Sequence, residues 1–253
     1  MLASIAMIIL AAYLLIGEPL LGRIAHQRLL AALDAGDNEA RLRFYRQWTW
    51  QGWALALITL ALTLGLAGWT PAQLGLHLPH DLPGSYGISP SFLAGFVPAA
   101  IAGMVIATVI ARRNKASTAT KPASPIPGGA NVTRMLPRTS RERWGFAALA
   151  VTAGLTEELI WRGFGLGALH IVLPQAHSTW LIALAALAFG WAHLYQGYTG
   201  MLATGVLGAL LAVLYIGTGS LLLPMLVHVL IDLRALLIPV GADTSQLENK
   251  PPA

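Results

Sequence analysis

The chain consists of long apolar runs separated by shorter polar ones. A helix needs about 20 mainly apolar residues to cross a bilayer. On that scale the sequence predicts an all-α integral membrane protein, a polytopic bundle of about seven transmembrane helices. The predicted spans are residues 2–21, 50–68, 92–111, 144–172, 179–194, 200–216 and 221–240. The first run lacks a basic start and an A-x-A-like cleavage site, so we expect a retained helix rather than a signal peptide.

Composition supports a membrane protein. The 253 residues are 56% hydrophobic and 11% charged, and the mean hydropathy is +0.64, so a water-soluble domain is disfavoured. The chain has no cysteine, which excludes disulfides, a thiolate zinc site and a cysteine nucleophile. The formal net charge of +5 is compatible either with a nucleic-acid partner or with basic residues held at the cytoplasmic surface of a membrane.

The positions of the basic residues favour the membrane. Thirteen of the sixteen Lys and Arg fall in two stretches, and residues 69–91 contain none. The positive-inside rule then predicts that the N-terminus lies outside and the C-terminus in the cytoplasm. We therefore expect the lipid bilayer, and no nucleic acid, as a partner. The two stretches contain Arg23, Arg28, Arg41, Arg43 and Arg46, and then Arg112, Arg113, Lys115, Lys121, Arg134, Arg138, Arg141 and Arg143.

A polar stretch divides the chain. Residues 114–138 are rich in Ser, Thr, Pro and Gly and lack an apolar run that would bury a core. The predicted organisation is an N-terminal three-helix part (1–111), a basic cytoplasmic linker (112–143), a four-helix catalytic core (144–240) and a polar C-terminal tail (241–253).

Ionisable residues within the spans are concentrated in the last four helices. Such a side chain at the bilayer centre costs about 2.5–3.5 kcal/mol on insertion scales, so it indicates a partner or a function. No comparable cluster occurs in the first three spans, where Glu18 lies near a helix end. The three groups are Thr156-Glu157-Glu158-Leu159-Ile160-Trp161-Arg162, Phe189-Gly190-Trp191-Ala192-His193 and His228-Val229-Leu230-Ile231-Asp232.

Helical spacing separates the two adjacent glutamates of the first group. Glu158 and Arg162 are four residues apart and share a helix face, which predicts a buried ion pair. Glu157 lies about 100° around the helix from Glu158 and is therefore left out of that pair. Taken alone, an ion pair of this spacing is also typical of pairs that only stabilise helix packing or folding.

The other two groups bring imidazoles. His228 and Asp232 share a face, and His193 comes from a different helix. Together with Glu157 they would supply a base for water and a donor for an oxyanion. Singly, His193 is equally compatible with a packing role, and His228 with Asp232 would satisfy each other. The convergence of all three groups in a nearly uncharged bundle favours a catalytic site.

In this order and on these helices, the three groups resemble the EExxxR, FxxxH and HxxxN/D motifs of the CPBP family. That family includes the type II CAAX prenyl endopeptidases and the bacterial bacteriocin-processing and immunity proteins, also called Abi proteins. The resemblance covers residues 144–240 and does not include the first three helices.

The resemblance implies a role for each residue. Glu157 would be the base that activates water, helped by His193, while His228 and Asp232 would stabilise the oxyanion. The supporting pair would be Glu158 with Arg162.

The need for a cofactor stays open. Members of the family are described both as metalloproteases and as glutamate proteases without a required metal, so the cofactor is either none or a divalent metal such as zinc. Glu157, His193 and His228 are the possible ligands. Zinc would, however, leave the general base to be found elsewhere, because Glu158 is occupied by Arg162.

Position 232 departs from the CAAX endopeptidases, which have Asn there. An ionised Asp cannot donate a hydrogen bond to an oxyanion. Asp232 is then protonated in its apolar site, orients His228, or helps to hold a metal.

The sequence thus predicts a multi-pass protein of the cell (inner) membrane that performs intramembrane proteolysis. It would be an endopeptidase, glutamate-type or metal-dependent, acting on a membrane-associated peptide or a membrane protein. The alternative from another class is a non-catalytic membrane protein: an immunity or partner-binding protein, or a proton-coupled carrier. Oligomeric state is not specified by the sequence.

Overall fold

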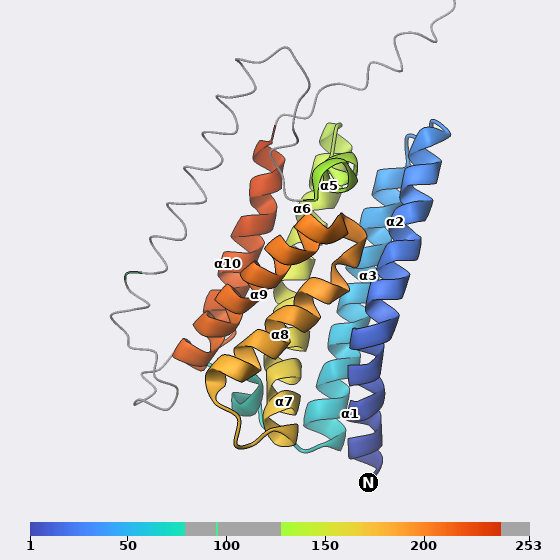
Figure 1. Ribbon diagram of the computed structural model, residues 1–253. Helices are drawn as coiled ribbons and strands as arrows, with labels where there is room; N and C mark the ends of the chain where they lie inside the picture. Colours follow the sequence, from blue (N-terminus) through green and yellow to red (C-terminus); the bar gives the residue numbers. More distant parts are fainter. Residues whose placement is uncertain (79–94, 96–127, 239–253) are drawn as a thin grey trace, which may run out of the picture.

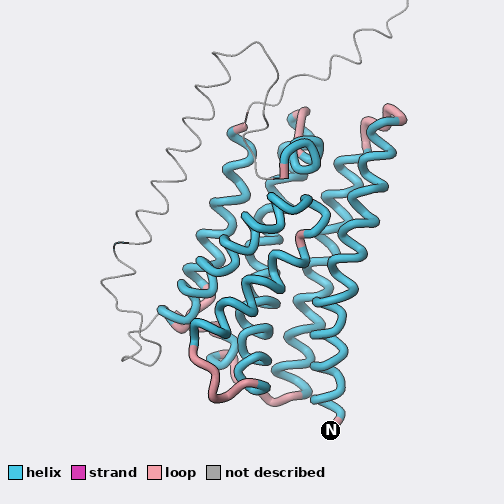
Figure 2. Tube along the Cα trace, viewed as in Figure 1, coloured by secondary structure: helices cyan, strands magenta, loops and turns pink. Residues whose placement is uncertain are grey.

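The computed structural model describes residues 1–78, 95 and 128–238, and within these ranges the chain forms helices and loops without a strand (Figures 1 and 2). The predicted all-α architecture is confirmed. Three helical runs of the described chain, Leu2–Asp34, Ala40–Leu66 and Leu194–Thr218, are long and apolar enough to cross a membrane, and Ser178–Ala192 is a shorter apolar helix. The predicted span 92–111 (apart from Gly95), residues 112–127 of the predicted linker and the predicted tail 241–253 lie outside the described residues.

Two long antiparallel helical runs form the N-terminal part (Figure 1). The first contains 33 residues, or roughly 50 Å of helix, and so exceeds the hydrocarbon core of about 30 Å. The run is therefore longer than one crossing requires, and its second half carries Arg23 and Arg28. The first run comprises α1 (Leu2–Ala12), the π-helical η1 (Tyr13–Gly17) and α2 (Glu18–Asp34), and the second comprises α3 (Ala40–Leu60) and the π-helical η2 (Ala61–Leu66), followed by the short η3 (Ala72–Leu74).

The C-terminal part contains four helical runs that carry the three charged groups. The first run changes from α-helix to π-helix directly after Glu158, a change often found at functional sites. The runs are α6 (Ser140–Glu158) with η4 (Leu159–Leu166) and α7 (Gly167–Val172); α8 (Ser178–Ala192); the short η5 (Leu194–Gln196) with α9 (Gly197–Thr218); and α10 (Leu222–Leu233) with η6 (Arg234–Leu237).

Glycines allow these helices to approach closely. A Cβ at Gly154 of α6 would lie 2.8 Å from the backbone nitrogen of Val229 on α10, and one at Gly190 of α8 would lie 2.7 Å from the Met201 carbonyl oxygen on α9. Small residues at such contacts are typical of membrane helix packing. The first contact matters most for the site, because Gly154 precedes Glu158 by one turn and Val229 follows His228.

Part of the predicted linker packs on the bundle. Residues Gly129–Met135 form α5. The buried His26 ring donates to the Asn131 carbonyl at 3.1 Å, and the Tyr45 hydroxyl donates to the Met135 carbonyl. Leu136, which follows the helix, is buried. The polar composition of this stretch did not predict this helix, whose backbone carbonyls accept hydrogen bonds from His26 and Tyr45 of the N-terminal helices.

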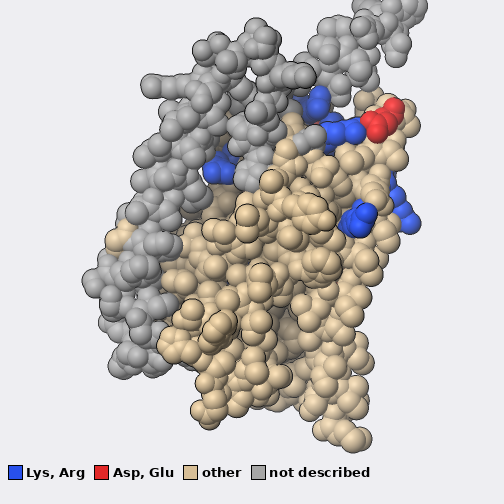
Figure 3. Space-filling view, in the orientation of Figure 1, with Lys and Arg blue, Asp and Glu red and all other residues tan. Residues whose placement is uncertain are grey.

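The surface is that of a multi-pass membrane protein. On the face shown in Figure 3, the charged side chains gather near the end of the molecule opposite the N-terminus. Elsewhere the helices expose large apolar side chains that a bilayer would cover and that a soluble protein rarely presents together. Examples are Ile8, Ile9, Leu57, Leu187, Leu202 and Val206.

Candidate active site

A sealed ion pair occupies the junction of α6 and η4. Arg162 Nη1 donates to Glu158 Oε1 at 2.7 Å, and the two side chains are 2% and 0% exposed. Arg162 Nη2 also donates to the Gly208 carbonyl at 3.2 Å, and the guanidinium lies 4.3 Å from the centre of the Phe189 ring. The contact predicted between Glu158 and Arg162 is confirmed, and the arginine is fully engaged.

His228 joins this pair from α10. Its Nδ1 donates to Glu158 Oε1 at 2.7 Å, so the same carboxylate oxygen accepts from both His228 and Arg162. The bond fixes a proton on Nδ1 and leaves Nε2 directed at Asp232, whose Oδ2 lies 3.8 Å away. His228 and Asp232 share a face as predicted, whereas the bond to Glu158 was not anticipated.

Glu157 lies outside the sealed pair and faces His193. Its Oε2 is 3.9 Å from His193 Nε2, which is too long for a direct hydrogen bond, and this oxygen is buried without a hydrogen-bond partner among the described residues. His193 Nδ1 donates to the Phe189 carbonyl at 2.8 Å, so Nε2 is the free acceptor of the neutral ring. Both histidines thus have Nδ1 occupied and Nε2 available.

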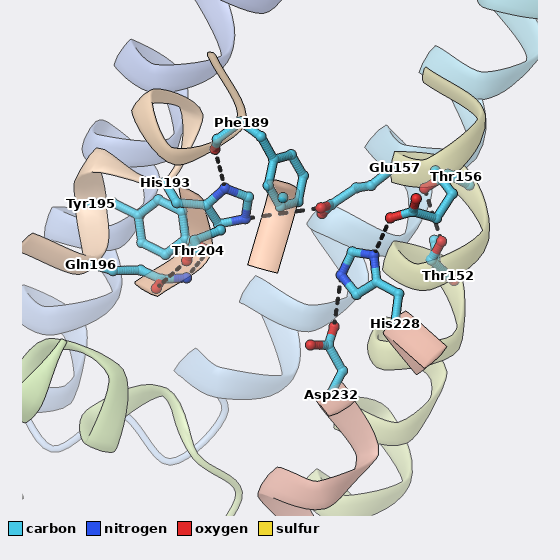
Figure 4. A network of polar contacts seen from close by, with 12 residues as sticks. Thr152, Thr156, Glu157, Phe189, His193, Tyr195, Gln196, Thr204, His228 and Asp232 are labelled. Carbon is cyan, nitrogen blue, oxygen red and sulfur yellow. Dashed lines mark hydrogen bonds and ion pairs between the residues drawn. The ribbon is translucent and has the colours of Figure 1, made fainter. Parts of the chain in front are cut away.

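Figure 4 shows the two contacts side by side, with Glu157 extending toward His193 and Asp232 approaching His228. His193 follows the last residue of α8, and Asp232 lies in the last turn of α10. The structure therefore brings together all four residues that the sequence predicts to be catalytic.

Phe189 connects the two contacts. Its ring centre lies 4.8 Å from that of His193 and 6.1 Å from that of His228, the latter edge to face. The same ring also covers the guanidinium of Arg162. The aromatic residue of the second group therefore contacts both imidazoles and the buried cation, which the sequence alone did not indicate.

A cavity of about 510 Å³ contains the site. Besides Glu157 and the two histidines, its lining includes Glu18 from α2 and Gln51 from α3. The N-terminal helices therefore contribute polar groups that the sequence analysis did not assign. The available signal was Glu18 itself, a carboxylate beside a long apolar run.

The described residues do not form a grouped metal-ligand set. Among the described residues, no three His, Asp or Glu side chains are grouped so that they could hold a metal ion. His228 and His193 have Nδ1 bonded to Glu158 and to the Phe189 carbonyl, which leaves both Nε2 atoms free, but these atoms and Glu157 are not grouped around one point in the structure. No step below is therefore routed through a metal.

Comparison with known proteins identifies the segment that carries the site. Residues 139–234 match the family model described as type II CAAX prenyl endopeptidase Rce1-like. No curated protein and no solved structure matches the chain. The match begins at Thr139, which caps the N-terminus of α6, and ends at Arg234, just after α10. It leaves out α1 to α3 and α5, so it covers less than half of the chain. The resemblance to the CPBP family is thereby confirmed: residues 139–234 are similar to the Rce1-like type II CAAX prenyl endopeptidases.

Proposed function

We propose that the protein is a membrane-embedded endopeptidase of the glutamate type, which hydrolyses a peptide bond of a membrane-associated peptide or a transmembrane segment. The observation that carries the proposal is the contrast between the adjacent glutamates. Glu158 is bonded to Arg162 and His228, whereas Glu157 lines the cavity with an unpaired oxygen facing a free imidazole nitrogen. The family match supports a protease.

In the proposed reaction, Glu157 removes a proton from a water molecule while His193 Nε2 accepts the water's second hydrogen bond. The water oxygen bonds to the carbonyl carbon of the substrate, and the carbonyl electron pair moves onto oxygen. A proton carried by Asp232, or by His228 Nε2 when the ring is an imidazolium, supplies the hydrogen bond that the oxyanion accepts. The carbon–nitrogen bond then breaks, and Glu157 gives its proton to the leaving amine.

The sealed pair has a supporting part in this scheme. Glu158 neutralises Arg162 and fixes the Nδ1 proton of His228, so that Nε2 faces the cavity. Charge within the apolar layer is thereby balanced without using Glu157.

The test is peptide cleavage by the purified protein in lipid, wild type against Glu157→Gln. The panel contains prenylated CAAX peptides, unprenylated lipid-anchored peptides and isolated transmembrane segments. Cleavage of one class by the wild type and not by Glu157→Gln supports the proposal. No cleavage by either would favour the non-catalytic alternative, and equal cleavage by both would show that Glu157 is not the catalytic base.

We also propose an orientation, with the N-terminus outside and the α2–α3 loop in the cytoplasm, from the positions of the basic residues. The chain has no cysteine, so single cysteines give a clean test. Ala35→Cys should be labelled from the cytoplasmic side and Gln175→Cys from outside, both positions being exposed. The reverse pattern would contradict the orientation.

A further inference from the structure

Glu18 is a second carboxyl group in the cavity with one oxygen, Oε2, that lacks a hydrogen-bond partner among the described residues. It lies in the first helical run, beside the Tyr13 hydroxyl and the Gln51 amide, and it lines the same cavity as Glu157. Gln51 Nε2 donates to the Tyr13 hydroxyl at 3.1 Å, which ties α3 to η1 next to the carboxyl group. Glu18 Oε2 is buried and has no hydrogen-bond partner among the described residues.

Two contacts hold Glu18 against the catalytic segment. Three residues before it, the Leu15 carbonyl accepts a hydrogen bond of 2.9 Å from Trp191 Nε1 of α8. Four residues after it, a Cβ at Gly22 would lie 3.2 Å from the Tyr195 ring of η5. Residues four apart share a helix face, so Glu18 faces the α8–η5 junction, where His193 lies.

Contacts between α3 and α6 hold Gln51 at the cavity. A Cβ at the adjacent Gly52 would lie 3.0 Å from the Thr156 hydroxyl, and Thr156 precedes Glu157. The Trp53 indole also donates to Thr152 at 3.1 Å, one turn earlier on α6. The two N-terminal runs thus bring Glu18 and Gln51 to the active-site cavity from outside the segment that matches the family.

The Oε2 atom of Glu18 requires a hydrogen-bond donor in addition to Tyr13 and Gln51. A buried carboxylate oxygen without a partner is costly, and the strongest donor for it is a nitrogen that carries hydrogen, above all a cationic one. Among the described residues that line the cavity the only Lys or Arg is Arg234, which lies directly after α10, at the opposite end of the described chain from Glu18. The donor is therefore expected from the molecule that the cavity binds.

We propose that Glu18, held by Tyr13 and Gln51, is a specificity-determining residue that accepts an N–H of the peptide next to the cleaved bond and favours a basic side chain there. The inference rests on the proposed peptidase function and deepens it. The N–H donor is either the side chain or the main chain of that peptide residue, and the two sources give different results below.

The experiment compares lipid-anchored peptides that differ at one position beside the cleaved bond, which is Lys, Met or Glu. For Glu18→Gln we expect kcat/KM to fall about tenfold on the Lys peptide and to stay within about threefold on the Met peptide, since a charged hydrogen bond contributes at least 1.4 kcal/mol. An equal fall on all peptides would support the main-chain donor. Unchanged kcat/KM on every peptide would overturn the proposal.

Two variants serve as controls. Glu39→Gln makes the same chemical change at an exposed residue paired with Arg141, and kcat/KM should not change. Tyr13→Phe removes the hydroxyl beside Glu18 and should lower the preference for Lys in the same direction but by less. This variant also provides the test if Glu18→Gln lowers the yield of folded protein.

A binding measurement separates this inference from the proposed function. Trp48 and Trp161 line the cavity, so their fluorescence should report peptide binding. The peptides used contain residues of D configuration, which prevents cleavage and retains the amide nitrogens that Glu18 would accept from. Tighter binding of the Lys peptide than of the Met peptide, lost in Glu18→Gln, would support the inference even if the wild type cleaved nothing. Binding that is equal in both proteins, together with equal cleavage, would refute it.

Discussion

Two regions of the site contain the same residue types in opposite states. In the sealed region, Glu158, Arg162 and His228 are almost fully buried and bonded to one another. In the open region, the side chain of Glu157 is 29% exposed, and its Oε2 lies 3.9 Å from His193 Nε2. Glu157 and Glu158 are adjacent in the chain, so packing and not residue type sets their different states.

The difference indicates how a membrane protein can keep a reactive carboxylate. A buried charge is tolerated when a partner and hydrogen bonds satisfy it, and Arg162 has both in Glu158, the Gly208 carbonyl and the Phe189 ring. With that cation neutralised, the neighbouring Glu157 is not drawn into an ion pair. We infer that the sealed region stabilises the fold and the open region carries the chemistry.

The largest expected effect is on turnover, in the open region. Glu157→Gln keeps the size and polarity of the side chain and removes the base, so activity should fall by about 10²- to 10⁴-fold. Protein yield should stay near that of the wild type, as judged by size-exclusion chromatography of the detergent-extracted protein. Loss of protein in this variant, with normal yield in Glu158→Gln, would mean that the roles of the two glutamates must be exchanged.

A large effect on stability is expected in the sealed region. Arg162→Met leaves Glu158 buried with His228 alone, and breaking a buried pair in this way costs about 3–5 kcal/mol. Thermal unfolding and folded yield would measure the loss. The matched control is Arg46→Met, which makes the same change at an exposed position and should have little effect. Similar stability of the two variants would argue against a structural role for the pair.

A smaller effect should follow from separating the helices that carry the two regions. Gly154→Ala places a Cβ within 2.8 Å of the Val229 backbone, and overpacking of this kind costs about 1–3 kcal/mol. Because Val229 adjoins His228, activity should fall along with stability. Gly65→Ala is the control, since nothing lies within 4 Å of a Cβ there. Equal melting temperatures would show that the α6–α10 contact adapts without cost.

The sequence was sufficient for contacts within one helix. α6 is regular up to Glu158, so spacing alone placed Arg162 beside Glu158 and directed Glu157 elsewhere. Contacts between helices were not predictable in this way. The bond from His228 to Glu158 joins residues 70 positions apart and depends on how closely α6 and α10 approach at Gly154.

The N-terminal contribution was missed for a related reason. No charged residue lies three or four positions from Glu18, so helical spacing did not mark it as part of a site. Its place in the cavity depends on the contact of Gly22 with Tyr195. Likewise α5 lies in a stretch whose composition indicates a linker, and its helix is held by His26 and Tyr45 from other helices.

The smallest effect is expected at Asp232, which lies between the two regions because it faces His228 but lines the cavity. If this position donates a hydrogen bond to the oxyanion, Asn is at least as good a donor as a protonated Asp, and Asp232→Asn should keep activity within about threefold of the wild type. Its activity should also be less sensitive to rising pH, because an amide has no proton to lose.

If Asp232 must instead be ionised to orient His228, the amide removes the charge, and activity should fall about tenfold or more, as losses of such supporting groups commonly do. The separation of 3.8 Å between His228 Nε2 and Asp232 Oδ2 favours the donor role, since an orienting bond would be shorter, and Glu158 already orients the ring through Nδ1. The measurement is a pH profile of kcat/KM for both proteins, with the exposed Asp34→Asn as the matched control. A tenfold loss at unchanged protein level would contradict the donor role and assign Asp232 to the charged support of His228.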